Sequence, residues 1–207
     1  IAGGGIITEL VHDEQEGLRE EARQREYAWL TGDVRAEDRA TQYGHRAAIV
    51  LFTGSAQTGK TFLARRVEAL LVADSRHAYL LEGENLLQGL DADLSAADPS
   101  FAAERVRRYG EVARLLIDTG LIVVSTSKTF GINYQRMAEM IRTLVQPAPV
   151  IAVHMSRAGE EPPPNTDLHF AGPQDFDAAA RQILEELKRR GVLIQPSGTK
   201  STIQYSI

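Results

Sequence analysis

The sequence predicts an α/β fold: a three-layer α/β/α sandwich with a mainly parallel sheet. Short apolar runs alternate along the chain with segments whose apolar residues recur at helical spacing. That alternation indicates parallel strands, buried on both faces and covered by helices. A glycine-rich loop at 54–61 stands between the first such strand and the first such helix. Its place indicates a ligand site at the carboxyl edge of the sheet.

The first half of the core supplies two strands and two helices. The segments 48–52 and 78–81 are apolar enough for buried strands. Between them, the apolar residues of 62–73 fall on one face of a helix, and a second helical stripe runs over 106–116. Gly120 is expected to end that second helix, because glycine readily adopts the left-handed backbone that terminates helices.

The second half continues the alternation. Strands are expected at 121–125 and 149–153, and helices at 136–145 and 176–187. The segment 160–164 is expected to be a rigid, solvated loop, since its three consecutive prolines support neither a helix interior nor a strand ladder.

Composition shifts divide the chain into three parts. Residues 1–45 are interpreted as an N-terminal arm or linker, 46–195 as the P-loop domain and 196–207 as a C-terminal tail. Within the arm, a short strand is expected at 6–11 and charged helices at 14–30 and 35–43.

Charge and cysteine content exclude several classes of function. Lys and Arg number 23 against 28 Asp and Glu, which gives a net charge of −5 without any basic block. Neither a nucleic acid nor a membrane is therefore an expected partner. The absence of cysteine excludes disulfides and thiolate metal sites and fits a cytoplasmic protein. The five histidines lack metal-binding spacing, which argues against zinc.

The glycine-rich loop fits the pattern G-x-x-x-x-G-K-[ST] of P-loop NTPase-like proteins. Glycines let the backbone turn its N–H groups toward phosphate oxygens, and the following helix start adds a favourable dipole. Lys60 supplies a positive charge for the β- and γ-phosphates, and Thr61 offers a hydroxyl to Mg²⁺. The alternative, an accidental glycine turn, is disfavoured by the strand–loop–helix context. ATP and Mg²⁺ are thus the expected cofactors, and the expected binding residues are Gly54, Ser55, Ala56, Gln57, Thr58, Gly59, Lys60 and Thr61.

Two carboxylates follow the strand expected at 78–81. Glu82 and Glu84 would lie at the same edge of the sheet as the glycine-rich loop. Carboxylates in that position can bind Mg²⁺ through water or accept the proton of an attacking hydroxyl. The alternative is a solvated acidic loop, and the residues alone leave both interpretations open.

Basic residues form a third group of candidates. Three arginines, 105, 107 and 108, share about one helical turn, and Lys128 and Arg136 follow the third strand. Arginines so grouped can clamp an anionic substrate, although for any single one of them a charged helix face is the simpler interpretation. Arg105, Arg108 and Lys128 are the candidate substrate-binding residues.

Taken together, these segments resemble the adenylylsulfate (APS) kinase family over about 36–193. The resemblance is carried by the loop at 54–61, by Leu81-Glu82-Gly83-Glu84-Asn85, and by Glu104 to Arg108 followed by Tyr109-Gly110-Glu111-Val112-Ala113. It implies transfer of the γ-phosphoryl group of ATP to the 3′-hydroxyl of adenylylsulfate. Under that reading Lys60, Glu82 and Glu84 are the catalytic residues.

The chain departs from the family pattern at several positions. Glu82 and Glu84 stand where the family has aspartates, Leu87 where it has a substrate-binding arginine, and Arg105 where it has asparagine. The connection 155–167 is too short for the family's basic lid. These departures affect positions that the family uses to bind adenylylsulfate and to close the site over it, whereas the phosphate loop is intact.

The opening glycines add a second, shorter resemblance. Gly3-Gly4-Gly5-Ile6-Ile7 is similar to the end of the last β-barrel of an elongation-factor-like GTPase. This similarity implies that the chain is the C-terminal domain of a fusion with the GTPase subunit of sulfate adenylyltransferase, cut at Ile1. That subunit is the expected partner, and a homodimer is a further expectation from the resemblance.

Two hypotheses of different class follow. In the first, the chain is an ATP-dependent phosphotransferase of sulfate assimilation, similar to adenylylsulfate kinase. In the second, it is a catalytically degenerate module that binds a nucleotide and regulates an attached sulfate-activating GTPase. ADP release in the presence of adenylylsulfate discriminates between them.

Overall fold

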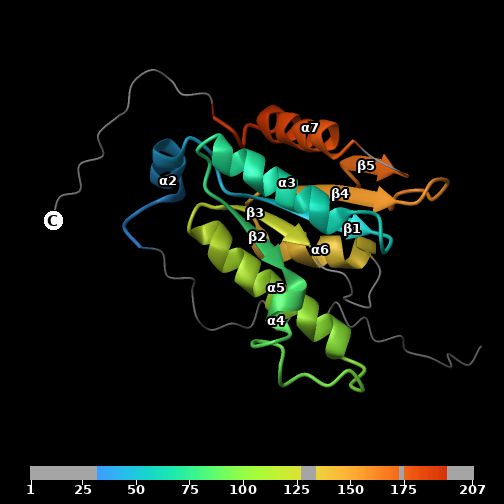
Figure 1. Cartoon of the computed structure of the whole chain (residues 1–207). Helices are drawn as coiled ribbons and strands as arrows, with labels where there is room; N and C mark the ends of the chain where they lie inside the picture. The colour runs from blue at the N-terminus through green and yellow to red at the C-terminus, as the bar shows by residue number, and fades with distance from the viewer. Residues whose placement is uncertain (1–31, 127–133, 173–174, 195–207) are drawn as a thin grey trace, which may run out of the picture. The chain divides into compact units, whose positions relative to one another are not determined.

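The computed structural model describes residues 32–126, 134–172 and 175–194 (Figure 1). The strand expected at 6–11, the helix expected at 14–30 and the C-terminal tail lie outside the described residues. The described residues from Val34 onward belong to one compact unit.

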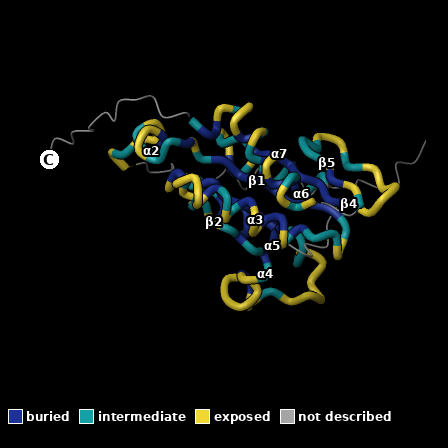
Figure 2. Tube along the Cα trace, turned by 45° about the horizontal axis from the view of Figure 1, so that its top comes forward, coloured by how far each residue is buried: buried dark blue, intermediate teal, exposed yellow. Residues whose placement is uncertain are grey.

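A five-stranded sheet in the order β2-β3-β1-β4-β5 forms the middle layer, and all its neighbouring strands are parallel. The strands are β1 (Ala48–Gly54), β2 (Ala78–Glu82), β3 (Ile122–Thr126), β4 (Val150–Ser156) and β5 (Leu168–Ala171). Every residue of β1 and β4 is buried, and both strands are dark blue in Figure 2. The near-continuous apolar sequence of β1 reflects this burial on both faces.

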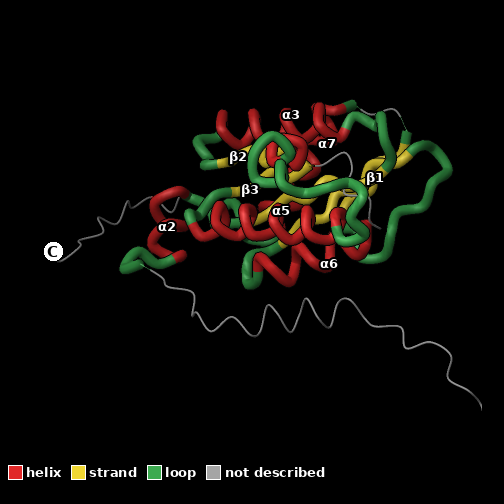
Figure 3. The backbone as a smooth tube through the Cα atoms, turned by 90° about the horizontal axis from the view of Figure 1, so that it is seen from below, coloured by secondary structure: helices red, strands yellow, loops and turns green. Residues whose placement is uncertain are grey.

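Helices cover both faces of the sheet (Figure 3). On one face lie α3 (Lys60–Ala73) and α7 (Phe176–Arg189), and on the other lie α5 (Phe101–Asp118) and α6 (Tyr134–Val145). Side chains of β1 alternate between the two layers, since Val50 and Phe52 join the core beneath α3 and α7 while Ile49 and Leu51 join the opposite core. The α/β/α sandwich predicted from the sequence is confirmed.

The four strands and four helices expected in the core are all present, with ends shifted by a few residues. The helix expected at 35–43 is present as α2 (Ala36–Tyr43). Two elements were not foreseen. Strand β5 has only four residues, of which Phe170 alone is buried, so it carries too little alternation to be recognised. The segment after β2 contains a single helical turn, α4 (Gly83–Leu86), where a loop was expected.

Within the described part of the chain, no helix combines the length and apolarity that crossing a membrane requires.

Gly54 is expected to be the least replaceable glycine of the sheet. Its φ is +119°, and a Cβ there would lie 1.9 Å from the carbonyl oxygen of Met155 in β4. Gly54→Ala should therefore lower the free energy of unfolding by about 2–4 kcal/mol, through backbone strain and overpacking. Chemical denaturation measures this loss. Gly89→Ala is the matched control, because a Cβ at Gly89 meets nothing within 4 Å; equal stability of the two variants would contradict the prediction.

Candidate functional site

The phosphate-binding loop leaves the sheet at the end of its central strand. Gly54 closes β1 and packs against the backbone of Met155. The loop ends at Gly59, whose left-handed backbone (φ +88°) leads directly into α3 at Lys60. The helix therefore begins where an anion held by the loop would gain most from its dipole.

Lys60 is folded back over the loop. Its Nζ donates hydrogen bonds to the carbonyl oxygens of Gly54 (2.9 Å) and Ser55 (2.5 Å), and only 8% of the residue is exposed. Burial lowers the pKa of Lys60, and the nearby carboxylate of Glu84 acts in the opposite direction. A phosphate group entering the loop would restore a full counter-charge to this buried ammonium group.

A carboxylate from beyond β4 also holds the loop. The Ser55 hydroxyl donates to Glu160 Oε2 at 2.5 Å, and the backbone N–H of Arg157 donates to the same oxygen at 3.0 Å. The hydrogen bond from Ser55 lowers the pKa of Glu160. The loop is thus tied to residue 160 by a negative charge, which would oppose an incoming phosphate chain.

The two glutamates expected near the loop lie at the predicted edge. Glu82 is the last residue of β2, and it is in register with Thr126 at the end of β3, beside Phe52 of β1. Glu84 lies in α4 and is close enough to Lys60 to influence its pKa. Strand ends that meet at one edge bring the acidic residues and the phosphate loop together.

Two buried hydroxyl groups, those of Tyr109 and Ser125, fix the end of β2 next to these glutamates. Tyr109 of α5 donates to the carbonyl oxygen of Leu81 (2.7 Å) and lies 2.6 Å from the hydroxyl oxygen of Ser125. Burial raises the pKa of Tyr109, so the phenol stays protonated and keeps its donor. The end of β2 is therefore fixed to both β3 and α5.

Oxygen ligands suited to Mg²⁺ gather at the same edge. The Oε1 atom of Glu82 and the Oγ1 atom of Thr126 are buried without a hydrogen-bond partner among the described residues. Glu82 nevertheless pairs with Arg65 at 3.5 Å. No cluster of three or more His, Asp or Glu side chains able to hold a metal exists among the residues that the structure describes. This donor set fits Mg²⁺, which usually binds through one or two carboxylates or hydroxyls together with substrate phosphates.

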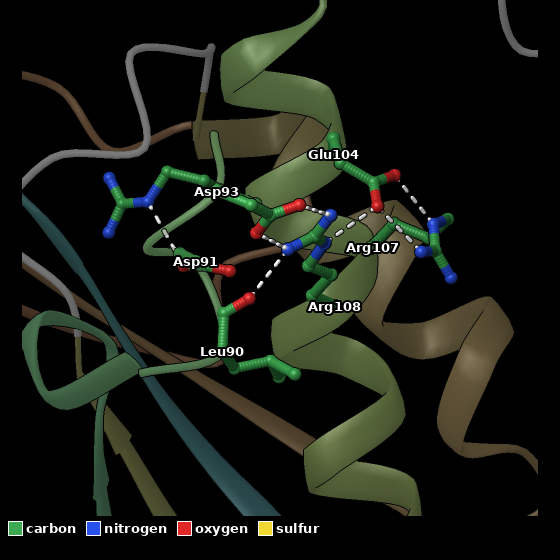
Figure 4. Close-up of polar contacts among 7 residues, drawn as sticks. Leu90, Asp91, Asp93, Glu104, Arg107 and Arg108 are labelled. Atoms are coloured by element: carbon green, nitrogen blue, oxygen red, sulfur yellow. Dashed lines mark hydrogen bonds and ion pairs between the residues drawn. The ribbon is translucent and has the colours of Figure 1, made fainter. Parts of the chain in front are cut away.

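The candidate substrate arginines are engaged within the protein. Arg105 is only 3% exposed, and its Nε lies 3.4 Å from Oδ2 of the buried Asp91. Arg108 pairs with Asp93 and Glu104 and donates to the carbonyl oxygen of Leu90 (Figure 4). Figure 4 shows that the segment after α4 is thereby held against α5. Contact of either arginine with a substrate would require exchange of these partners. Lys128 lies outside the described residues.

Two contacts of the site, Ser55–Glu160 and Arg105–Asp91, are hard to predict from the local sequence. The Ser55–Glu160 hydrogen bond joins residues 105 positions apart, and Glu160 belongs to a segment interpreted only as a solvated loop. For Arg105, an acidic partner can be expected once the arginine is known to be buried, because a buried guanidinium requires a nearby carboxylate. The choice of Asp91 over other acidic residues nevertheless depends on the path of the 87–100 segment.

The fold and the loop define the class of protein: a P-loop nucleotide-binding α/β domain. Comparison with known families makes this specific, since the family profile "Adenylylsulphate kinase" matches residues 46–162. The chain belongs to the adenylylsulphate kinase family.

Known relatives agree with this membership. An adenylyl-sulfate kinase of Yersinia pestis is 29% identical over 194 residues, which span 80% of this chain and 89% of the relative. The structure of a mutant APS kinase from Mycobacterium tuberculosis has 29% sequence identity and a TM-score of 0.61, and the match covers 70% of this chain and 99% of that chain. A structure of the same enzyme in complex with AMPPNP and APS matches with 24% identity, a TM-score of 0.59 and the same coverage.

Glu104 is expected to stabilise the fold in a pH-dependent way. Hydrogen bonds from Arg107, and then from Arg108, lower the pKa of Glu104 from 4.5 to about 2. Because the folded-state pKa is depressed, the stabilisation is present above pH 4.5 and is lost as the pH falls toward 2. Glu104→Gln should therefore lower the free energy of unfolding by about 1–2 kcal/mol at pH 7, with the difference shrinking below pH 4.5. Urea denaturation across this range tests it, with Glu37→Gln on the exposed face of α2 as control.

Removing the charge of Glu160 is expected to strengthen binding of ATP. Glu160→Gln keeps an oxygen that can accept from Ser55 but removes a negative charge beside the phosphate loop. We expect ATP·Mg²⁺ to bind about 1.5- to 5-fold more tightly at low salt, with the gain fading at high salt. Isothermal titration calorimetry at two ionic strengths measures this. The neighbouring exposed Glu161→Gln is the control, and weaker binding by Glu160→Gln would contradict the electrostatic argument.

Proposed function

We propose that this chain is an ATP-dependent phosphotransferase that acts as an adenylylsulfate kinase in sulfate assimilation. ATP and adenylylsulfate would give ADP and 3′-phosphoadenylylsulfate. The observation that carries the proposal is that Glu84, in α4 just past the end of β2, is close enough to Lys60, at the start of α3, for its carboxylate to oppose the lowering of that lysine's pKa by burial. Membership of the family supports this assignment.

The residues of the loop would share the work of binding ATP. The backbone of Gly54 to Thr61 would surround the β-phosphate, and Lys60 would leave its two loop carbonyls to contact the β- and γ-phosphates. Thr61 would hold Mg²⁺ with the help of an acidic side chain at the edge. Bound Mg²⁺ would neutralise charge on the phosphates during transfer.

The glutamates would act on the acceptor. Glu82 or Glu84 would orient the attacking hydroxyl and accept its proton as the oxygen bonds to the γ-phosphorus and ADP leaves. Their side chains are one methylene longer than aspartate, and α4 begins immediately after Glu82, so the two glutamates stand at the junction of β2 and α4. Arg105, Arg108 and Lys128 remain the candidate residues for the anionic acceptor, with partner exchange required at the two arginines.

A specific observation also favours the second candidate, a nucleotide-binding regulatory module. Arg105 is buried against Asp91, Arg108 is held by Asp93 and Glu104, and only the connection 157–167 joins β4 to β5. If Arg105 and Arg108 kept these partners, neither would contact the acceptor, and the site would bind ATP without turning it over. We also propose, from the resemblance to the family, that the protein is cytoplasmic, forms a homodimer, and is fused to the GTPase subunit of sulfate adenylyltransferase.

ADP release discriminates between the two candidates. We expect the purified chain with ATP·Mg²⁺ to release ADP when adenylylsulfate is added, and Lys60→Ala to reduce the rate by at least about 100-fold, since one preorganised charge on the transferred group is lost. A coupled ADP assay measures this, with exposed Lys188→Ala on α7 as the matched control. ATP binding that Lys60→Ala abolishes, without acceptor-dependent ADP, would refute the kinase and support the regulatory module.

A further inference from the structure

An exposed aromatic ring stands on the first turn of α3, beside the phosphate loop. Phe62 follows Lys60 and Thr61 directly and is 62% exposed, the highest exposure among the large hydrophobic residues in the described part of the chain. Leu63 and Ala64, the next two residues, are fully buried. The helix therefore turns its core face inward at this point and leaves Phe62 in solvent at the mouth of the loop.

A second ring supports Phe62 from the start of α7. The ring centroids of Phe62 and Phe176 are 4.8 Å apart with an interplanar angle of 52°. The Phe176 ring also covers the loop itself, since a Cβ on Gly59 would lie 2.6 Å from its Cζ. The two rings therefore lie next to the phosphate loop, one at the start of α3 and the other at the start of α7.

Polar contacts fix the position of this aromatic pair. The Asp175 side chain caps α7 by accepting from the backbone N–H groups of Asp177 (3.0 Å) and Ala178 (3.1 Å). One turn along α3 from Phe62, Arg66 pairs with Asp177 at 2.6 Å. The cap fixes the start of α7, and the Arg66–Asp177 ion pair joins that start to α3 next to Phe176.

We propose that Phe62, backed by Phe176, is the stacking surface for the purine base of the ATP held by the phosphate loop. This inference rests on the proposed binding of ATP at the loop. With the β- and γ-phosphates over Lys60 and Thr61, the α-phosphate, sugar and base would leave the loop along the first turn of α3, where Phe62 stands. Stacking on an aromatic face tolerates solvent on the other side of the base, as the exposure of Phe62 requires.

Two ligands separate base stacking from phosphate binding. ATP·Mg²⁺ and inorganic tripolyphosphate·Mg²⁺ share the phosphate chain but differ in the base. We expect Phe62→Ala to weaken ATP binding by about 5- to 100-fold and to leave tripolyphosphate binding unchanged. Phe62→Trp should retain the affinity for ATP. Calorimetry without acceptor measures each dissociation constant, and Val72→Ala, at another exposed apolar position on the same helix, is the matched control.

Each other outcome has a defined meaning. Unchanged ATP binding by Phe62→Ala, or equal losses for both ligands, would overturn the stacking surface. Unchanged ATP binding with a raised KM for adenylylsulfate would also overturn it and move the base contact to the acceptor. ATP binding that depends on Phe62 but leads to no ADP release would support the surface and refute only the kinase. If the wild-type chain binds neither ATP nor tripolyphosphate, both the stacking surface and the proposed ATP-dependent function would be overturned.

Discussion

The close contact between Gly54 and the Met155 carbonyl is the constraint on which the site depends. It lets two parallel backbones, β1 and β4, approach at the point where the phosphate loop turns out of the sheet. Ser55 continues the contact, since its N–H donates to the same Met155 carbonyl at 3.0 Å. The loop therefore begins from a fixed place in the middle of the sheet, and α3 carries that position on to Lys60.

Rigidity at the acidic edge comes from another source. Tyr109 and Ser125 fix the end of β2 through buried hydroxyl groups, while Asp91 and Arg105 hold the following segment against α5. A buried ion pair contributes little net stability, because desolvation of both charges offsets their attraction. Its effect is to select one path for the chain after α4.

Much of this arrangement could be predicted from the sequence. The strand at 48–52 can be predicted from its apolar run, and the helix at 62–73 from the spacing of its apolar residues. The motif from Gly54 to Thr61 then places the phosphate loop between them. Strand β5 escaped because four edge residues carry almost no pattern. The partners of Arg105 and Ser55 escaped because they come from segments without regular structure, whose course is decided by tertiary packing.

The buried pair of Asp91 and Arg105 also constrains how this sequence can change. Asparagine, the residue of the family pattern at position 105, would remove the cation and strand the Asp91 carboxylate, one oxygen of which already lacks a hydrogen-bond partner among the described residues. Breaking a buried pair in this way costs about 3–5 kcal/mol. A change of Arg105 to asparagine alone is therefore strongly destabilising, and a compensating change at Asp91 would have to accompany it.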